Sequence, residues 1–163
     1  MTKYLFLFAF LFVCSLSMYG QSIKFNDLVY FTMLTNRQVY DNLTEGRDFR
    51  QEYTMDVNGR ELEYFKNIGN KPNSEKIVIG NYTKLDNGTV LHTVNYTSVN
   101  YQNIINMISQ AKRFGLDLKF RGADEANNIY LFDNGFYHVS IYLRRDQTSG
   151  LVEIKQKEYL NLD

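Results

Sequence analysis

The two histidines, His92 and His138, are the residues of this chain best suited to acid–base chemistry near neutral pH. A histidine paired with a carboxylate can act as a general base, so the sequence allows a small hydrolase. No nucleophile stands at a recognisable spacing from either histidine. On an alternating strand His92 shares a face with Val94 and Tyr96, which favours a core or edge histidine over a catalytic one.

Acidic residues form two close pairs, Glu61 with Glu63 and Asp124 with Glu125. Two such carboxyl groups can serve as general acid and base. The first pair alternates with apolar residues, as on the solvated side of a strand, and the second falls in a polar connection. We therefore interpret both pairs as solvated surface residues.

Metal and cofactor sites are not expected. Without thiolates a zinc site would need both histidines and several carboxylates, and no H-E-x-x-H motif occurs. The run from Asp56 to Gly59 resembles the start of a calcium loop but lacks the later oxygen ligands, so a hairpin turn is the better interpretation. Glycine-rich phosphate loops and the G-x-S-x-G elbow are also absent from the sequence.

A binding surface is the remaining possibility for the chemistry-bearing residues. Alternation places every second residue from 138 to 144 on one side of a strand, opposite Val139. Tyrosine and arginine carry much of the energy of protein interfaces. The pattern predicts a contact patch that consists of His138, Ser140, Tyr142 and Arg144.

Helices and strands that would position these residues follow a regular order. Apolar spacing predicts a helix over about 25–43, followed by Gly46, and another over about 99–114, followed by Gly115. After each helix the period changes to two, which is typical of antiparallel strands with one buried face. The dipeptides at 58–59, 87–88, 134–135 and 149–150 mark hairpins, and Asn-Gly favours a type I′ turn. We expect strands at about 49–56, 60–66, 76–84, 89–97, 116–121, 127–133, 137–145 and 150–158.

The order of helix and four strands occurs twice. Sliding one half over the other places residues 76–79 on 138–141 and Gly88 on Gly150, and a shifted alignment pairs Gly46 with Gly115. We therefore predict an α+β fold of two tandem units, each a helix with a four-stranded antiparallel sheet, with repeat halves at 24–97 and 98–160.

This order resembles, at the level of architecture, the tandem-repeat fold of the β-lactamase-inhibitory proteins. The resemblance rests on the helix stops Gly46 and Gly115 and on the hairpin glycines Gly88 and Gly150. Those proteins are secreted, and their two helix-plus-sheet units form a concave face that binds protein. The resemblance implies such a face here and assigns no contact residue.

The first 20 residues have the pattern of a cleavable signal peptide. Lys3 precedes an apolar run that ends near Cys14, and a weakly polar exit leads to Gly20. We predict a signal peptide at 1–20, as in some Gram-negative bacteria, and a single mature domain at 21–163 that is secreted or periplasmic. The alternative is a lipoprotein, because Leu11 stands three residues before Cys14 as in part of a lipobox. The run is shorter than the roughly 20 residues that cross a bilayer, and no second hydrophobic stretch follows it in the sequence, so no membrane span is expected after signal removal.

Charge and cysteine content exclude several classes of function. The chain has 18 Lys+Arg and 18 Asp+Glu, which leaves no electrostatic footprint for nucleic acid or an anionic membrane. Cys14, the single cysteine, lies in the expected signal, so the mature chain would have no disulfide and no thiol nucleophile.

These observations favour an exported, non-catalytic binding protein of the bacterial cell envelope. Its partner would be a protein or another envelope component, and the oligomeric state stays open. One alternative is the small hydrolase that uses His92 or His138 with a carboxylate. The other is a purely structural component of an envelope assembly.

Overall fold

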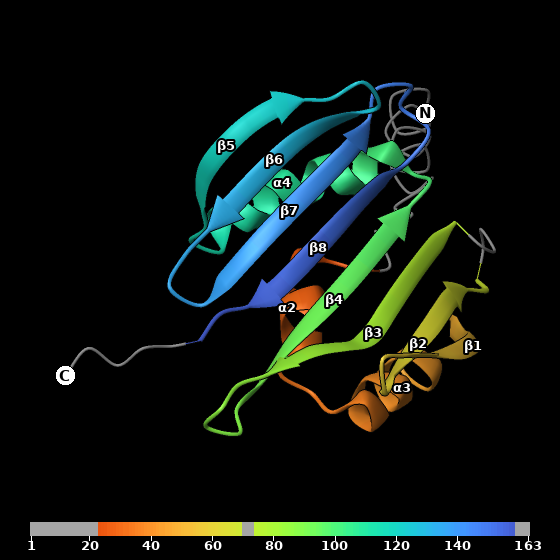
Figure 1. Ribbon diagram of the computed structural model, residues 1–163. Coiled ribbons are helices and arrows are strands. Elements are labelled where there is room, and N and C mark those ends of the chain that lie inside the picture. Colours follow the sequence, from red (N-terminus) through yellow and green to blue (C-terminus); the bar gives the residue numbers. More distant parts are fainter. Residues whose placement is uncertain (1–22, 70–73, 159–163) are drawn as a thin grey trace, which may run out of the picture.

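The computed structural model describes residues 23–69 and 74–158, which form three helices and eight strands (Figure 1). The expected signal at 1–20, Cys14 and Pro72 lie outside the described residues. In chain order the elements are α2 (Phe25–Thr32), α3 (Asn36–Thr44), β1 (Phe49–Val57), β2 (Arg60–Asn67), β3 (Glu75–Lys84), β4 (Val90–Ser98), α4 (Tyr101–Arg113), β5 (Asp117–Ala123), β6 (Asn127–Asp133), β7 (Tyr137–Arg144) and β8 (Gly150–Gln156). All eight predicted strands are present, with ends shifted by no more than a few residues.

The strands form one antiparallel sheet in the order β1-β2-β3-β4-β8-β7-β6-β5 (Figure 1). Each set of four consecutive strands is a meander, and the two meanders join where β4 pairs with β8 from Thr93 to Ser98. The α+β class and the antiparallel sheet are therefore confirmed. The predicted division into two helix-plus-sheet units is not confirmed, because backbone pairing across β4 and β8 makes the sheet continuous.

The first predicted helix is two helices, so the expectation of one helix over 25–43 is wrong. The helical conformation is interrupted between Thr32 and Asn36, and Thr35 caps the start of α3. The Thr35 hydroxyl accepts a hydrogen bond from the Gln38 backbone N–H (3.3 Å), and Gln38 Oε1 accepts one from the Thr35 backbone N–H (3.0 Å). This reciprocal capping box satisfies backbone donors that a new helix leaves unpaired. The break lets α2 pack on β4 and β8 while α3 packs on β1.

Hairpins form at or next to all four predicted dipeptides, but only the first has the predicted type I′ turn. Asn58 and Gly59 have φ of 55° and 75°, as a type I′ turn requires. At the next two Asn-Gly dipeptides the asparagine φ is not positive. There the side-chain oxygens of Asn87 and Asn134 each accept a 2.9 Å hydrogen bond from the backbone N–H two residues later. Such a bond stabilises a turn without positive φ at the asparagine.

The last hairpin turns earlier than expected. Its turn precedes Ser149, with Gln147 at φ 58°, and Gly150 is the first residue of β8. Asp146 favours this position, because its Oδ1 accepts the backbone N–H of Thr148 at 3.1 Å. Aligning Gly88 with Gly150 is therefore wrong, since Gly88 belongs to a turn and Gly150 to a strand.

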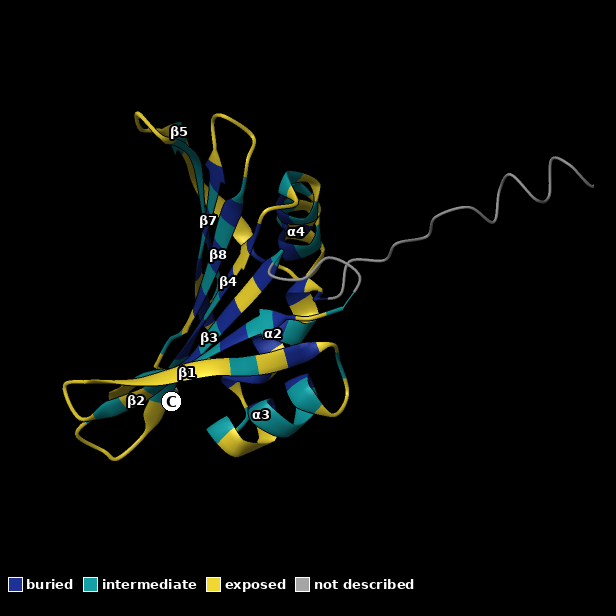
Figure 2. Cartoon of the chain, turned by 90° about the vertical axis from the view of Figure 1, so that its right-hand side faces the viewer, coloured by how far each residue is buried: buried dark blue, intermediate teal, exposed yellow. Residues whose placement is uncertain are grey.

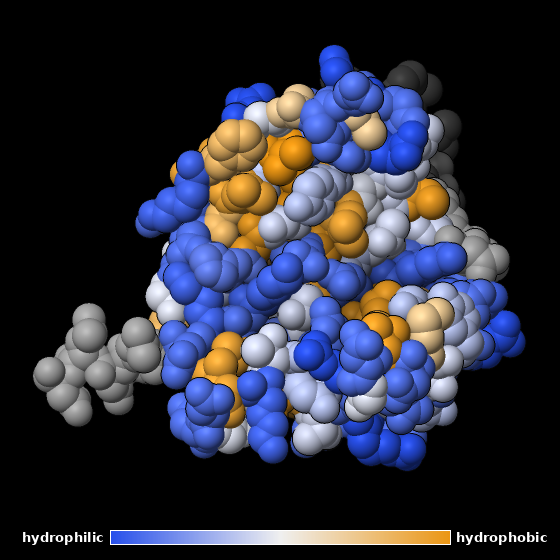
Figure 3. All heavy atoms as spheres, in the orientation of Figure 1, coloured by the Kyte–Doolittle hydropathy of each residue, from blue (hydrophilic) through white to orange (hydrophobic). Residues whose placement is uncertain are grey.

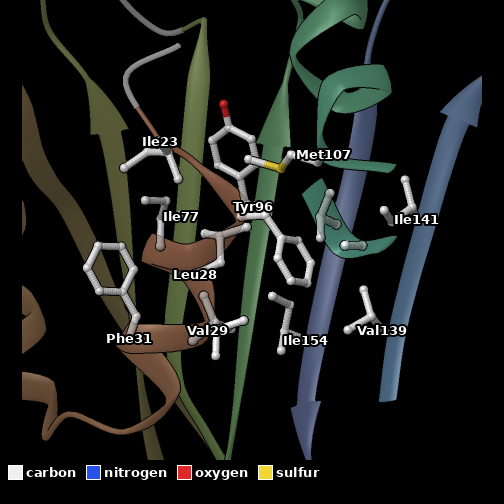
Figure 4. Packing of buried hydrophobic residues seen from close by; sticks show 14 of the residues in the cluster. Ile23, Leu28, Val29, Phe31, Ile77, Tyr96, Met107, Val139, Ile141 and Ile154 are labelled. Carbon is white, nitrogen blue, oxygen red and sulfur yellow. The ribbon is translucent and has the colours of Figure 1, made fainter. Parts of the chain in front are cut away.

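The hydrophobic core lies between the sheet and the three helices (Figure 4). Alternate residues of the central strands enter it, which explains the period-two pattern. Burying one such large apolar side chain contributes about 1.5–3 kcal/mol. The labelled members in Figure 4 are Ile23, Leu28, Val29, Phe31, Ile77, Tyr96, Met107, Val139, Ile141 and Ile154.

Both outer hairpins contain a β-bulge at the corresponding place. In β1 the register shifts between Gln51 and Tyr53, where β2 steps from Phe65 to Tyr64. In β5 it shifts between Leu118 and Phe120, where β6 steps from Phe132 to Leu131. In each hairpin, one residue of the edge strand is skipped just after a pair that includes a buried phenylalanine.

Candidate functional site

Helices α2, α3 and α4 all lie on one side of the sheet, as the edge-on view in Figure 2 shows. We call the opposite side the bare face. The sheet bends so that β5 and the β1–β2 hairpin both extend toward the bare face (Figure 2). Since Val139 and Ile141 of β7 are buried beneath the helices, the residues that alternate with them belong to the bare face.

All four residues of the predicted contact patch lie on the bare face of β7. Each of the first three is flanked by a residue of β6 and a residue of β8. These rows are Asp133–His138–Lys155, Leu131–Ser140–Glu153 and Ile129–Tyr142–Leu151. The patch therefore changes along the strand from charged at His138 to apolar at Tyr142.

The charged end of the patch is an ion-pair cluster. His138 Nδ1 contacts Asp133 Oδ2, and Lys157 Nζ lies 2.9 Å from Asp133 Oδ1. Partial burial acts to raise the pKa of Asp133, but the hydrogen bond from Lys157 and the nearby His138 outweigh it, so this pKa lies below its usual value. Within the described residues the imidazole pairs with Asp133 and makes no hydrogen bond to Ser140.

Arg144 at the other end is held by the turn that follows it. Its guanidinium forms two-point contacts with Asp146, including Nη2 to Oδ2 at 2.9 Å. This hydrogen bond, with others from Thr148, holds the pKa of Asp146 well below its usual value. Half of the Arg144 side chain stays exposed, at 50%.

A shallow hollow of about 400 Å³ adjoins the patch on the bare face. It lies where β7 ends and β8 begins, beside Tyr142 and Arg144. Its lining residues are Thr97, Asn127, Tyr142, Arg144, Ser149, Gly150 and Leu151. Two of the four residues predicted from sequence therefore line it.

The bare face divides into two regions of different polarity. In Figure 3 apolar atoms gather over β5 to β7, and hydrophilic atoms form a band across the middle of the face. The apolar region includes Phe120, which is 49% exposed, and the half-buried Ile129 and Leu131. Scattered apolar residues are normal on a protein surface, but a contiguous group is more often a contact site.

Sequence reasoning missed a row of basic residues on the bare face, which we call the basic row: Arg50, Lys66 and Lys76. Lys66 lies directly opposite both of the others across β1 and β3. Glu52 accompanies them, with Lys66 Nζ 2.8 Å from Glu52 Oε1. That hydrogen bond and the three positive charges lower the pKa of Glu52, although desolvation acts in the opposite direction. Alternation predicts the side of each residue, but only strand register brings the three together.

His92 lies on the other side of the sheet from His138. The residues next to it in β4 belong to the bare face, so His92 itself belongs to the opposite side. Its ring lies beside the Tyr82 ring, with the ring centroids 6.4 Å apart. Burial lowers the pKa of His92, as expected for a partly buried histidine. The two histidines therefore cannot act in one site.

The acidic candidates have structural functions in turns and strands. Asp56 Oδ1 accepts the Gly59 backbone N–H at 3.0 Å, which closes the first hairpin. Asp124 Oδ1 accepts hydrogen bonds from the backbone N–H groups of Ala126 and Asn127. Glu63 lies within a strand, where partial burial raises the pKa of its carboxyl group. Among residues 23–69 and 74–158, no group of three or more His, Cys, Asp or Glu is arranged to hold a metal ion.

Comparisons with protein-family models, with curated proteins and with solved structures find no match for this chain. Among the described residues, no helix is long and apolar enough to cross a membrane.

Proposed function

We propose that this protein is a non-catalytic binding protein and that the bare face around Tyr142 is its binding site. One observation carries the proposal: the hollow on this face is lined by both Tyr142 and Arg144. Tyrosine offers an apolar ring with a polar tip, and arginine offers a planar group of hydrogen-bond donors. These two residue types most often dominate the energy of protein interfaces.

The contacts of Arg144 support a preformed site. Asp146 fixes the guanidinium at the rim of the hollow before any partner arrives. A side chain that is already ordered loses less conformational entropy on binding. Its exposed half remains available to a carbonyl or carboxylate of the partner.

Export is the second part of the proposal. The signal pattern at residues 1–20 supports export of a mature chain that begins at Gln21, to the periplasm or outside the cell. The intact mass of the protein from an envelope fraction distinguishes cleavage before Gln21 from lipidation at Cys14.

We also propose that the two four-stranded meanders arose by duplication, as the resemblance to the β-lactamase-inhibitory proteins implies. The matching bulges of the β1–β2 and β5–β6 hairpins support it, because in both the register shifts just after the pair that includes a buried phenylalanine. Two helices, α2 and α3, precede the first meander and one helix, α4, precedes the second, so the copies would have diverged in their helical parts.

The test of the binding site compares the wild-type protein with Tyr142→Ala/Arg144→Ala. Each protein is immobilised and exposed to an envelope extract, and the captured proteins are quantified by mass spectrometry. We expect the double variant to lose at least about tenfold in its main captured partner, because truncating interface hot spots costs about 2 kcal/mol or more. Both side chains are partly exposed, so the thermal unfolding temperature should change little.

The matched control is Tyr30→Ala/Arg113→Ala, which removes the same residue types from α2 and α4. It should capture the partner as the wild type does. Equal capture by the wild type and Tyr142→Ala/Arg144→Ala would contradict the proposed site.

A hydrolase is the second candidate, and the contact between His138 and Asp133 favours it. Against it, His138 is 59% exposed, and the hollow lies at the opposite end of the patch. The test is to assay the protein with a panel of ester substrates. Hydrolysis by the wild type that is lost in His138→Ala would support a hydrolase and contradict the binding proposal.

A further inference from the structure

The basic row is an unfavourable arrangement for an isolated protein. Lys66 faces Lys76 across β2 and β3 and faces Arg50 across β1 and β2. Like charges in directly opposed positions destabilise a sheet, and Glu52 offsets only part of the positive charge. The whole chain has equal numbers of acidic and basic residues, so this row is a local excess. A negatively charged partner would relieve the repulsion.

The basic row and the hollow lie on one line of directly opposed residues. Tyr142 of β7 faces Leu151 of β8, and Leu151 faces Thr97 of β4. Thr97 in turn faces Lys76, where the basic row begins. The hollow and the positive charges are therefore two parts of a continuous track across the bare face.

The length of this track fits a short peptide. Five strand-to-strand steps separate β7 from β1, and at about 4.8 Å each they span about 24 Å. An extended chain covers about 3.3 Å per residue, so about seven residues reach from the hollow to Arg50.

An aromatic platform borders the basic end of the track. Tyr53 and Tyr64 stack with ring centroids 4.3 Å apart and an interplanar angle of 19°. Tyr64 shares the bare face with Lys66, two residues further along β2. Tyr53 is 46% exposed, so its ring is accessible to a partner beside the charges.

We propose that the bare face binds an extended protein segment with an aromatic or apolar side chain for the hollow and a group of acidic residues for the basic row. This inference rests on the proposed function, because it takes the bare face as the binding site. A flat anionic membrane fits less well, since Asp133 and Glu153 lie on the same face and would be repelled. The hollow is also local, as suits one anchoring side chain.

The probe is an array of synthetic peptides of about ten residues. Each carries one aromatic residue and three acidic, three amide or three basic residues at varied spacing. Affinities for the full protein are then measured by fluorescence polarisation with labelled copies of the best binders. We expect acidic peptides to bind at least about tenfold more tightly than their amide counterparts, because several charge pairs form together.

Two double variants locate the effect. Lys66→Gln/Lys76→Gln should reduce the preference for acidic peptides to within about twofold. It removes the Lys66–Glu52 ion pair together with the repulsion within the basic row, and leaves the hydrophobic core unchanged. The charge-matched control Lys24→Gln/Lys112→Gln lies outside the bare face and should keep the full preference. Circular dichroism and thermal unfolding establish that both variants are folded.

Each other outcome overturns the inference. Peptides that bind regardless of charge, and lose binding in Tyr142→Ala, would leave the proposed function intact and reject an acidic partner. Vesicles with phosphatidylglycerol that bind through Lys66 and Lys76, when no peptide does, would identify a membrane surface. If no peptide and no vesicle binds, an acidic segment is rejected. The proposed function fails with it only if Tyr142→Ala/Arg144→Ala also captures envelope proteins normally.

Discussion

Tyr96 and Glu75 form a buried polar contact at the end of the sheet where β3 begins. The Tyr96 hydroxyl donates a 2.6 Å hydrogen bond to Glu75 Oε1, and the two residues are 0% and 5% exposed. Asn103 of α4 donates to the same oxygen at 3.1 Å. Burial, together with the Glu75 carboxylate, raises the pKa of Tyr96 far above its usual value, so the hydroxyl keeps its proton.

Tyr96→Phe removes one donor from Glu75 and also removes the contacts of the hydroxyl with Ser98 and Asn103. We expect the free energy of unfolding, measured by urea denaturation, to fall by about 1–3 kcal/mol, because a buried acceptor loses a hydrogen bond. Tyr53→Phe is the control, since Tyr53 is exposed and its ring can still stack. Equal stability of the two variants would show that the Tyr96 hydroxyl does not stabilise the fold.

Single residues were predictable from sequence as far as alternation determines them. It assigns His138, Ser140 and Tyr142 to one side of a strand, and the burial of β7 agrees. It does not show that Arg144 pairs with Asp146, because that contact depends on the shape of the turn. The basic row escaped notice for a similar reason, since its members are distant in sequence and meet only through strand register.

At the scale of elements, sequence periodicity failed at Thr35, where it predicted one continuous helix in place of α2 and α3. Apolar residues continue at helical spacing on both sides of the break, so hydrophobic pattern alone predicts one helix. The capping signature was present in the sequence, with Gln38 three residues after Thr35. Strands were easier to predict, because residues alternate with period two and hairpin dipeptides mark four of the six hairpin connections.

Thr35→Ala removes the hydroxyl that caps α3. The expected loss in the free energy of unfolding is about 0.5–2 kcal/mol, the usual cost of losing an N-cap. Thr35→Ser keeps an equivalent oxygen and should stay near wild-type stability in the same denaturation experiment. If alanine and serine give the same stability, the cap does not fix the start of α3.

At the scale of the whole molecule, the pairing of β4 with β8 could not be predicted from local pattern. Hairpin signals describe neighbours in sequence, whereas this pairing joins the ends of two meanders that α4 and three strands separate. The pairing determines the function that we propose. It creates one broad bare face on which the hollow and the basic row lie together.

The most direct test of the binding face is hydroxyl-radical footprinting of the protein with its captured partner, read residue by residue by mass spectrometry. If the bare face is the site, Tyr142 and Leu151 become protected, while Tyr30 on α2 and Phe114 after α4 react as in the free protein. Protection of Tyr30 and Phe114 with unchanged reactivity at Tyr142 and Leu151 would contradict the account.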